Sequence, residues 1–350
     1  MLLVICQVLA GILAFAAIAQ ALFAWVFTRH LIGAVKPYDQ ATKQRNRKQP
    51  PVAVVLSLRG ADPDLERGLL QLFSQSYPDY HVYITVDREE DPAAAAVQKA
   101  IAASGFSHVS VQPLCKRRET CSLKNSALLQ MLEQVPERYP LIVQADADLV
   151  FHPDWLAELA APLADPQVGA VFGNRWFWPE EGRLGSLVRY LWNAAAVVPM
   201  WLFRIPWGGT LAVRREIFVK TDLCEKLGKA AVDDALMRSA VESLGQQIVF
   251  APRLMMTNRE ECSSKFALEF ITRQMLWTRL YHPRWFPVVL HAAISTAIFL
   301  LCVVLMVAGA LSRKHLPVMA FCRSGWLPTF HGRAFSIARA RYAPHCPAPE

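Results

Sequence analysis

The sequence predicts an α/β fold in which a mostly parallel sheet is flanked by helices. Between residues 50 and 146, short runs rich in valine, isoleucine and leucine alternate with longer amphipathic or alanine-rich runs. Apolar runs of about four to eight residues are typical of buried strands, whereas helices need about ten or more residues. Strands that alternate with helices in this way form a parallel sheet covered by helices.

The expected elements follow this alternation and become less regular after residue 165. Strands are expected at 52–58, 81–87, 108–114 and 141–146, with helices at 64–76, 92–104 and 121–135. The later part is expected to hold strands at 168–174 and 246–252, an amphipathic stretch at 184–203, a turn at 207–215 and a helix that begins around Asp233 and Asp234.

Two long apolar segments enclose this region. Leu2 to Phe27 contains no charged residue, and Phe286 to Leu311 contains only a histidine, a serine and a threonine as polar interruptions. Each exceeds the roughly 20 residues with which a helix crosses a bilayer. A cleaved signal peptide is the alternative for the first segment, but no basic region precedes it and its apolar run is too long. We therefore expect two membrane helices, the first uncleaved.

The distribution of charge and cysteine sets the expected location. The net charge is +8, and a basic cluster directly follows the first apolar segment: Arg29, Lys36, Lys43, Arg45, Arg47 and Lys48. Positive charge beside a membrane helix marks its cytoplasmic side, so we expect an integral membrane protein in which the region from about 29 to 285 faces the cytoplasm. The cluster explains much of the charge without nucleic acid. The eight cysteines form no CxxC pair, which argues against a zinc site or a disulfide framework.

The expected organisation has five parts. They are a membrane helix (1–28), a basic linker (29–50), an α/β domain (51–285, with halves 51–164 and 165–285), a second membrane helix (286–311) and a basic tail (312–350). Basic and aromatic residues mix in the stretch 264–286, which suits a helix lying in the membrane interface. An ordinary core helix is the alternative for that stretch.

Carboxylates follow two of the expected strands. Asp87 and Asp91 come after the second strand, and Asp146 and Asp148 come after the fourth. Ligands of such sheets bind beyond the carboxyl ends of the strands. Neighbouring carboxylates raise each other's pKa unless positive charge lies between them, and a divalent cation is the usual partner. A solvated strand end is the alternative for Asp146 and Asp148.

The order of acidic and aromatic motifs resembles that of the family-2 glycosyltransferases, which have a GT-A fold. An aspartate follows strand two, a DxD follows strand four, a carboxylate pair opens a later helix, and an R-x-x-x-W stretch precedes a membrane helix. The chain is most similar to the membrane-bound branch that includes ceramide glucosyltransferase and bacterial lipid glycosyltransferases, over about residues 50 to 311. The resemblance implies an inverting enzyme that moves a sugar from a UDP-sugar to a lipid hydroxyl with Mg²⁺ or Mn²⁺.

The resemblance also implies residue roles on the donor side. Asp87 or Asp91 would contact the nucleotide, and the two stay alternatives. Lys124 and Asn125 match a Lys-Asn element that helps to hold the nucleotide. The DxD would be Asp146 and Asp148, with Asp148 as the more direct metal ligand.

Other matching residues lie on the acceptor side. Asp234 takes the position of the catalytic base, and Asp233 replaces the glutamate that usually precedes it. Trp277, Trp207 and the glycines after it, Gly208 and Gly209, would line the acceptor site, where glycines allow a sugar to approach the backbone. A simple helix N-cap is the alternative for the two aspartates.

One motif departs from the family pattern. The inner arginine that faces the diphosphate is replaced by Leu276 in the sequence from Arg273 to Trp277. Arg273 and Arg279 flank this position at helical spacing and are expected to supply the charge.

Two short segments and two other functions stay open. The run RWFWP (175–179) is interpreted either as an acceptor lid or as buried packing, and NREEC (258–262) has no assigned chemistry. The alternative functions are a polysaccharide or polyprenyl-phosphate sugar synthase of the same fold, and a catalytically silent membrane scaffold, for which Leu276 is the main support.

Overall fold

The computed structural model describes residues 2–35, 49–62 and 64–311. The chain divides into two compact units, of which one holds residues 29 to 288 and the other holds the terminal segments. Residues 36–48 of the predicted linker and the predicted tail at 312–350 lie outside the described residues.

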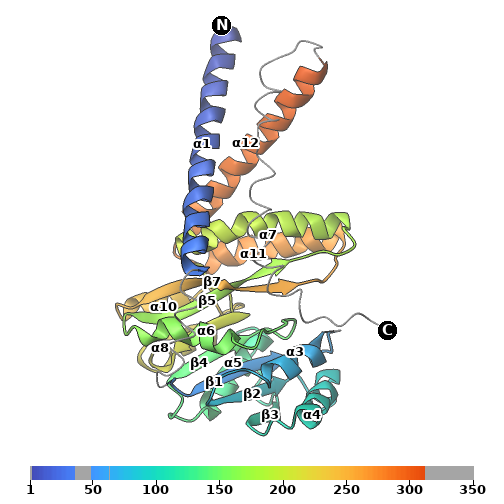
Figure 1. Cartoon of the computed structure of the whole chain (residues 1–350), viewed down its shortest axis with the longest axis vertical. Coiled ribbons are helices and arrows are strands. Elements are labelled where there is room, and N and C mark those ends of the chain that lie inside the picture. The colour runs from blue at the N-terminus through green and yellow to red at the C-terminus, as the bar shows by residue number, and fades with distance from the viewer. Residues whose placement is uncertain (1, 36–48, 63, 312–350) are drawn as a thin grey trace. The chain divides into compact units, whose positions relative to one another are not determined.

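The α/β region is built on one seven-stranded sheet with the order β3-β2-β1-β4-β6-β5-β7 (Figure 1). The strands are β1 (Val52–Leu58), β2 (Tyr80–Val86), β3 (Val109–Pro113), β4 (Leu141–Ala145), β5 (Val168–Phe177), β6 (Thr210–Arg214) and β7 (Gln247–Asn258). Neighbouring strands of the sheet run parallel, except that β6 runs antiparallel to both β4 and β5. This confirms the predicted mostly parallel sheet.

Helices connect and cover these strands. They are α3 (Leu65–Leu72), α4 (Pro92–Ser104), α5 (Leu123–Gln134), α6 (Trp155–Ala160), the 3₁₀ helix η2 (Ala161–Ala164), α7 (Leu184–Phe203), α8 (Arg215–Lys220), α9 (Leu223–Leu227), α10 (Met237–Ser243) and α11 (Ser264–Tyr281). Caps fix where several of them begin: Ser122 accepts a hydrogen bond from Asn125 N at 3.1 Å, and Ser263 accepts one from Phe266 N at 3.2 Å.

Two predictions for the second half are wrong. The expected turn at 207–215 contains strand β6, whose residues are largely buried; the two glycines before it obscured the strand pattern. The expected helix at Asp233 begins only at Met237, as α10. Asp233 and Asp234 lie in the preceding loop and are not N-caps, because their side chains contact Lys124 and the backbone of Gly208 instead.

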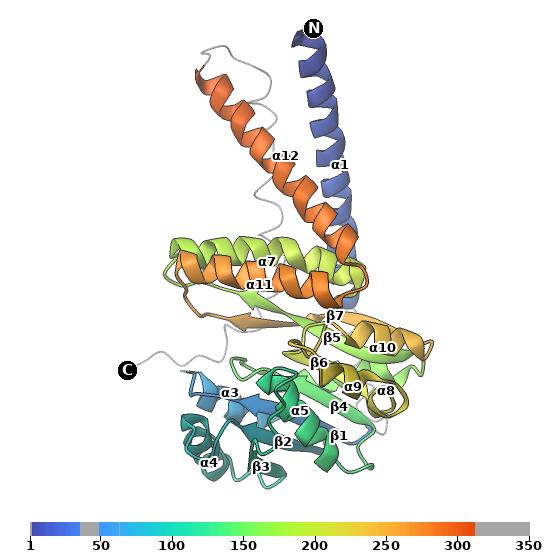
Figure 2. The same ribbon diagram turned by 180° about the vertical axis from the view of Figure 1, so that it is seen from behind.

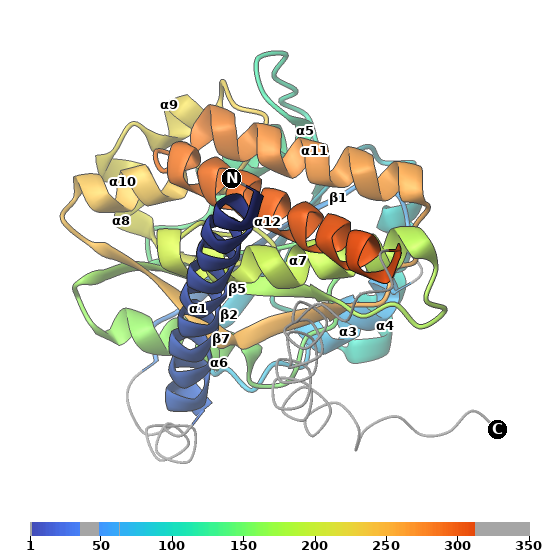
Figure 3. The same cartoon turned by 90° about the horizontal axis from the view of Figure 1, so that it is seen from above.

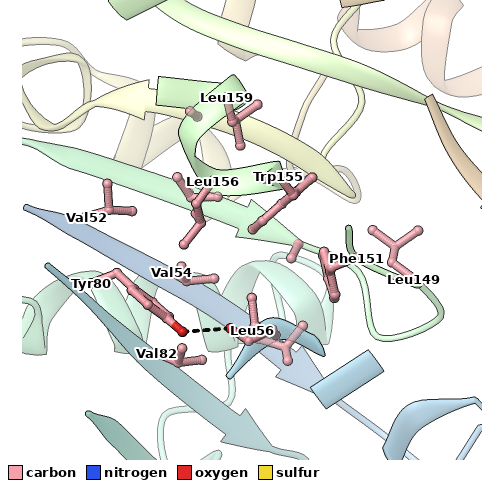
Figure 4. Packing of buried hydrophobic residues seen from close by; sticks show 14 of the residues in the cluster. Val52, Val54, Leu56, Tyr80, Val82, Leu149, Phe151, Trp155, Leu156 and Leu159 are labelled. Atoms are coloured by element: carbon pink, nitrogen blue, oxygen red, sulfur yellow. Dashed lines mark hydrogen bonds between the residues drawn. The ribbon is translucent and has the colours of Figure 1, made fainter. Parts of the chain in front are cut away.

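A hydrophobic core fixes the end of β4. Val54 of β1 and Val82 of β2 are fully buried beside Trp155 and Leu156 of α6 (Figure 4). Leu149, directly after the DxD, is fully buried in the same cluster. Burying side chains of this kind contributes about 1.5–3 kcal/mol each, so the loop that carries the DxD is anchored by packing.

The two predicted apolar segments form helices, α1 (Leu2–Val35) and α12 (Trp285–Leu311). The first continues past its predicted end at residue 28. Within the described residues, no helix combines the length and the apolar character that crossing a membrane requires.

Helices α7 and α11 lie side by side over β5 and β7 (Figures 2 and 3). The outer face of α7 is apolar: Leu184, Val188 and Leu191 are 69%, 41% and 54% exposed. Its inner face is polar, since Arg189 and Asn193 are buried. Helices of globular proteins usually have the opposite arrangement.

Candidate active site

Acidic side chains from both halves meet where β4 ends. Asp146 and Asp148 follow β4, and the backbone N–H of Asp146 donates to Gly209 O at 3.4 Å, just before β6. The antiparallel pairing of β4 with β6 therefore brings the loop 207–209 to the DxD.

Lys124, in the first turn of α5, joins the DxD to the second carboxylate pair. Its Nζ lies 2.6 Å from Asp146 Oδ1 and 2.9 Å from Asp233 Oδ2. Burial disfavours the charged ammonium, but Asp146 and Asp233 outweigh this effect and raise the pKa of Lys124. Lys124 thus connects Asp146, predicted on the donor side, with Asp233, predicted on the acceptor side.

A second cation, Arg175 of β5, bridges the two DxD carboxylates. Its Nη2 lies 2.8 Å from Asp146 Oδ2 and 3.1 Å from Asp148 Oδ1. Burial favours the neutral acid, but Lys124 and Arg175 hold the pKa of Asp146 below its ordinary value. Burial raises the pKa of Asp148, which Arg175 only partly opposes.

Asp234 is held by the backbone on the other side of this cluster. The N–H of Gly208 donates to Asp234 Oδ2 at 3.0 Å. Burial and the neighbouring charge of Asp233 raise the pKa of Asp234 to about 7. A carboxylate with a pKa near neutrality is suited to accept a proton in a reaction at physiological pH.

The two glycines at 208 and 209 are required by close contacts inside the cluster. A Cβ at Gly208 would lie 2.2 Å from Asp233 Oδ2, and a Cβ at Gly209 would lie 2.6 Å from Asp146 Oδ2 and 2.2 Å from the ring of Trp207. The expected reason was the approach of a sugar; the observed approach is that of the backbone to the two aspartates.

Asn258 is a site residue that the sequence analysis missed, as it missed Arg175. Its Nδ2 donates to Asp148 Oδ2 at 2.9 Å, and its Oδ1 accepts from Glu260 N at 3.0 Å. Arg175 lies in RWFWP, which was interpreted as an acceptor lid or as buried packing, and Asn258 lies in NREEC, which had no assigned chemistry. Their position on β5 and β7 became evident only from the strand pairing.

Asp87 and Asp91, the two candidates for the aspartate that contacts the nucleotide, have different partners in the structure. Asp87 is buried and pairs with Arg117 Nη2 at 2.8 Å. Asp91 caps α4, and its Oδ1 accepts hydrogen bonds from Ala93 N and Gly60 N, both at 2.9 Å. Both contacts hold loops at the sheet edge, and they leave the choice between the two aspartates open.

Asn125 holds the loop that carries the second carboxylate pair. Its Nδ2 lies 2.9–3.0 Å from three carbonyl oxygens, those of Leu227, Ala230 and Val232, which share its two N–H donors. The side chain is completely buried. Asn125 therefore positions the loop before Asp233, and its contact with a nucleotide, which the resemblance implied, stays a prediction.

The predicted motif from Arg273 to Trp277 lies on α11, and the described contacts of its arginine are with aromatic rings and not with the carboxylates. The guanidinium of Arg273 lies 5.2 Å from the ring centroid of Trp277. The guanidinium of Arg279 lies 6.0 Å from the ring centroid of Trp285. Leu276 is 48% exposed. The only polar link of this helix to the cluster's loops that the described residues show is Tyr281, whose hydroxyl accepts from Ala231 N at 3.1 Å.

The DxD carboxylates fit a divalent cation that is shared with a ligand. Among the described residues, no group of three or more His, Cys, Asp or Glu side chains could hold a metal without other ligands. Mg²⁺ is usually held by one or two carboxylates together with substrate phosphates. Asp146 Oδ2 and Asp148 Oδ1 already share one cationic nitrogen, that of Arg175, so the pair is placed to share a cation.

The fold is similar to that of solved glycosyltransferases. A mannosyltransferase from Pyrobaculum calidifontis, in complex with GDP-Man and Mn²⁺, matches 90% of this chain and 93% of its own with 19% identity and a TM-score of 0.53. Glucosyl-3-phosphoglycerate synthase from Mycobacterium tuberculosis, in complex with Mn²⁺ and UDP-Glc, matches 65% of this chain and 78% of its own with 18% identity and a TM-score of 0.39.

A family model extends the similarity to nearly the whole chain. The model for glycosyl transferase family 21 matches residues 9–333. This match confirms the resemblance to enzymes of the ceramide glucosyltransferase kind. Given the GT-A architecture, the joined carboxylates and this match, the chain belongs to glycosyl transferase family 21 and is a glycosyltransferase.

Proposed function

We propose that this enzyme transfers a sugar from a UDP-sugar to the hydroxyl group of a lipid, with inversion and with Mg²⁺ or Mn²⁺ at the DxD. The observation that carries the proposal is the connected cluster in which Lys124 contacts both Asp146 and Asp233, beside Asp234. It unites the residues that would hold the donor with a carboxylate whose pKa suits a base.

The reaction is a single displacement at the anomeric carbon. Asp234 accepts the proton of the acceptor hydroxyl, whose oxygen forms the new bond to that carbon. The bond from the anomeric carbon to the diphosphate oxygen breaks, and its electron pair leaves with the nucleoside diphosphate. One base and one displacement give inversion.

Asp148 and Asp146 are the residues that would hold the metal. A bound cation supplies positive charge that stabilises the departing diphosphate. Lys124 keeps Asp146 ionised and oriented, while Asn258 fixes the second oxygen of Asp148.

A lipid acceptor is supported by the surface formed by α7 and α11. The exposed face of α7 is apolar, and α11 carries exposed Lys265 and Arg273 among apolar residues such as Leu268. Such surfaces lie in the interface of a bilayer, where basic residues meet anionic lipid. We propose that the enzyme associates with the membrane through this surface, with the basic residues that follow α1 in the sequence on the cytoplasmic side.

Labelled donors test this function directly. Membranes that contain the protein are incubated with UDP-glucose, UDP-galactose, UDP-N-acetylglucosamine or GDP-mannose plus Mn²⁺ or Mg²⁺, and the lipid extract is analysed. We expect one sugar per lipid from a UDP-sugar, product formation lowered by about 10²-fold or more with Asp234→Asn, and full product with the exposed control Arg183→Gln. Label in a polymer would instead support a polysaccharide synthase, and label from GDP-mannose alone would contradict the donor assignment.

A further inference from the structure

We propose that Arg175 is the arginine that binds the leaving diphosphate: it bridges the DxD carboxylates before the donor binds and moves onto the diphosphate when the cation and donor bind. This inference rests on the proposed function, since it requires a donor with a diphosphate. It assigns to β5 the charge that the motif on α11 lacks.

The first support is the position of the guanidinium. Its Nη2 contacts one oxygen of Asp146 and one of Asp148, and the side chain is 18% exposed. The aromatic ring of Trp207 lies 4.9 Å from the guanidinium carbon. Arginine stacks favourably on aromatic faces, so the side chain has an apolar surface along which it can shift without being exposed to water.

The second support is unused hydrogen-bonding capacity. The guanidinium has five N–H donors, and its two contacts with carboxylates both use Nη2. Its Nε is buried and has no hydrogen-bond partner among the described residues. Buried donors are nearly always paired in native proteins, so Nε is available to an acceptor that a bound ligand would supply. The planar fork of arginine matches the oxygens of a phosphate.

The third support is competition for the same oxygens. Asp146 and Asp148 would have to hold the cation with the oxygens that now contact Arg175. A largely buried guanidinium that loses these carboxylates needs another anion, because an unpaired buried charge is costly. The diphosphate arrives with the cation and supplies that anion. Asn258 keeps its bond to the other oxygen of Asp148 during the exchange.

The fourth support is the absence of a nearer candidate on α11. The motif position for the diphosphate arginine is Leu276, and the described contacts of Arg273 and Arg279 are with aromatic rings. Within the described contacts, Arg175 and Lys124 are the cations that touch the DxD. Both cations contact two carboxylates, but the ammonium of Lys124 has three N–H donors whereas the guanidinium of Arg175 has five, and the Nε of Arg175 is buried without a hydrogen-bond partner among the described residues.

Binding measurements on the purified full-length protein test the exchange without turnover. Isothermal titration is done with Mn²⁺ alone, and then with UDP and UMP at saturating Mn²⁺, on the wild type, Arg175→Gln, Arg175→Lys and the exposed control Arg183→Gln. For Arg175→Gln we expect Mn²⁺ alone to bind several-fold more tightly, because a competing cation is gone. UDP should bind about 10- to 100-fold more weakly, as expected for lost charge-assisted hydrogen bonds. The affinity for UMP, which has one phosphate, should fall less than the affinity for UDP. Arg175→Lys should lose less affinity for UDP than Arg175→Gln does.

Other outcomes would overturn the inference. Weaker Mn²⁺ binding in Arg175→Gln would show that Arg175 only organises the carboxylates, and an unchanged UDP affinity would exclude the diphosphate contact. If the wild type binds no UDP, the proposed function fails, and the Mn²⁺ titration decides the carboxylate part of the inference: tighter binding supports it and unchanged binding overturns it. If the glutamine variant does not fold, the lysine variant is judged by the same two affinities.

Discussion

At the scale of single residues, the protonation of Asp234 sets how the activity depends on pH. Burial and Asp233 raise its pKa to about 7, and a general base must be ionised to accept a proton. We therefore expect kcat to rise with pH through about 7 and then level off. Asp234→Asn should lower kcat by about 10²- to 10⁴-fold. A rate that stays constant from pH 5.5 to 8.5 would contradict the assignment of Asp234 as the base.

The same carboxylate affects stability with the opposite dependence on pH. Its folded-state pKa lies above the ordinary value of 3.8, so the folded protein binds this proton more tightly than the unfolded chain does. The contribution is fully present below pH 3.8 and is lost as the pH rises through about 7. Between pH 5 and 8, the melting temperature of the wild type should therefore fall relative to that of Asp234→Asn. Two parallel curves would contradict the raised pKa.

At the scale of elements, Asn125 links α5 to the loop before Asp233. Asn125→Ala removes a donor from three carbonyls. Those of Leu227 and Ala230 keep backbone donors, Ala230 N and Ser122 N, whereas the carbonyl of Val232 loses its donor. An unsatisfied buried group costs about 1–3 kcal/mol, so we expect the free energy of unfolding, measured in urea, to fall by about 1–3 kcal/mol. The control Lys229→Ala removes an exposed side chain from the same loop and should change it by less than about 0.5 kcal/mol. Equal losses in both variants would contradict the role of Asn125.

The first half of the fold could be predicted because each of its strands and helices is marked by the pattern of neighbouring residues in the sequence. Each strand from β1 to β4 is followed closely by its own helix or by the DxD, so hydrophobic periodicity located the sheet edge and Asp146. In the second half, β6 pairs antiparallel between β4 and β5, and nothing in the local pattern at Thr210 reveals this partner. The positions of Arg175 and Asn258 depend on that pairing, so the site residues contributed by β5 and β7 could not be found from spacing.

At the scale of the whole molecule, the reversed polarity of α7 has a structural cause. Arg189 is buried between the rings of Phe177 and Phe266 and pairs with Glu260 at 2.6 Å. Polar groups on the inner face thus hold α7 to the segment that carries Asn258. The apolar outer face is left for contact with a different environment, which we propose to be lipid.

Charge placed on this outer face tests whether α7 contacts the bilayer that presents the acceptor. Val188→Glu combined with Leu191→Glu should lower turnover of a lipid acceptor in vesicles by about ten-fold or more, because two exposed apolar contacts are replaced by charges that anionic lipid repels. Turnover of a short-chain, water-soluble acceptor should stay unchanged, since neither residue contacts the carboxylate cluster. Val219→Glu, at a position that is 69% exposed on α8, is the matched control and should leave both rates unchanged. Equal losses with both acceptors would mean that the double variant damages the fold, and no loss with vesicles would exclude α7 from the bilayer surface.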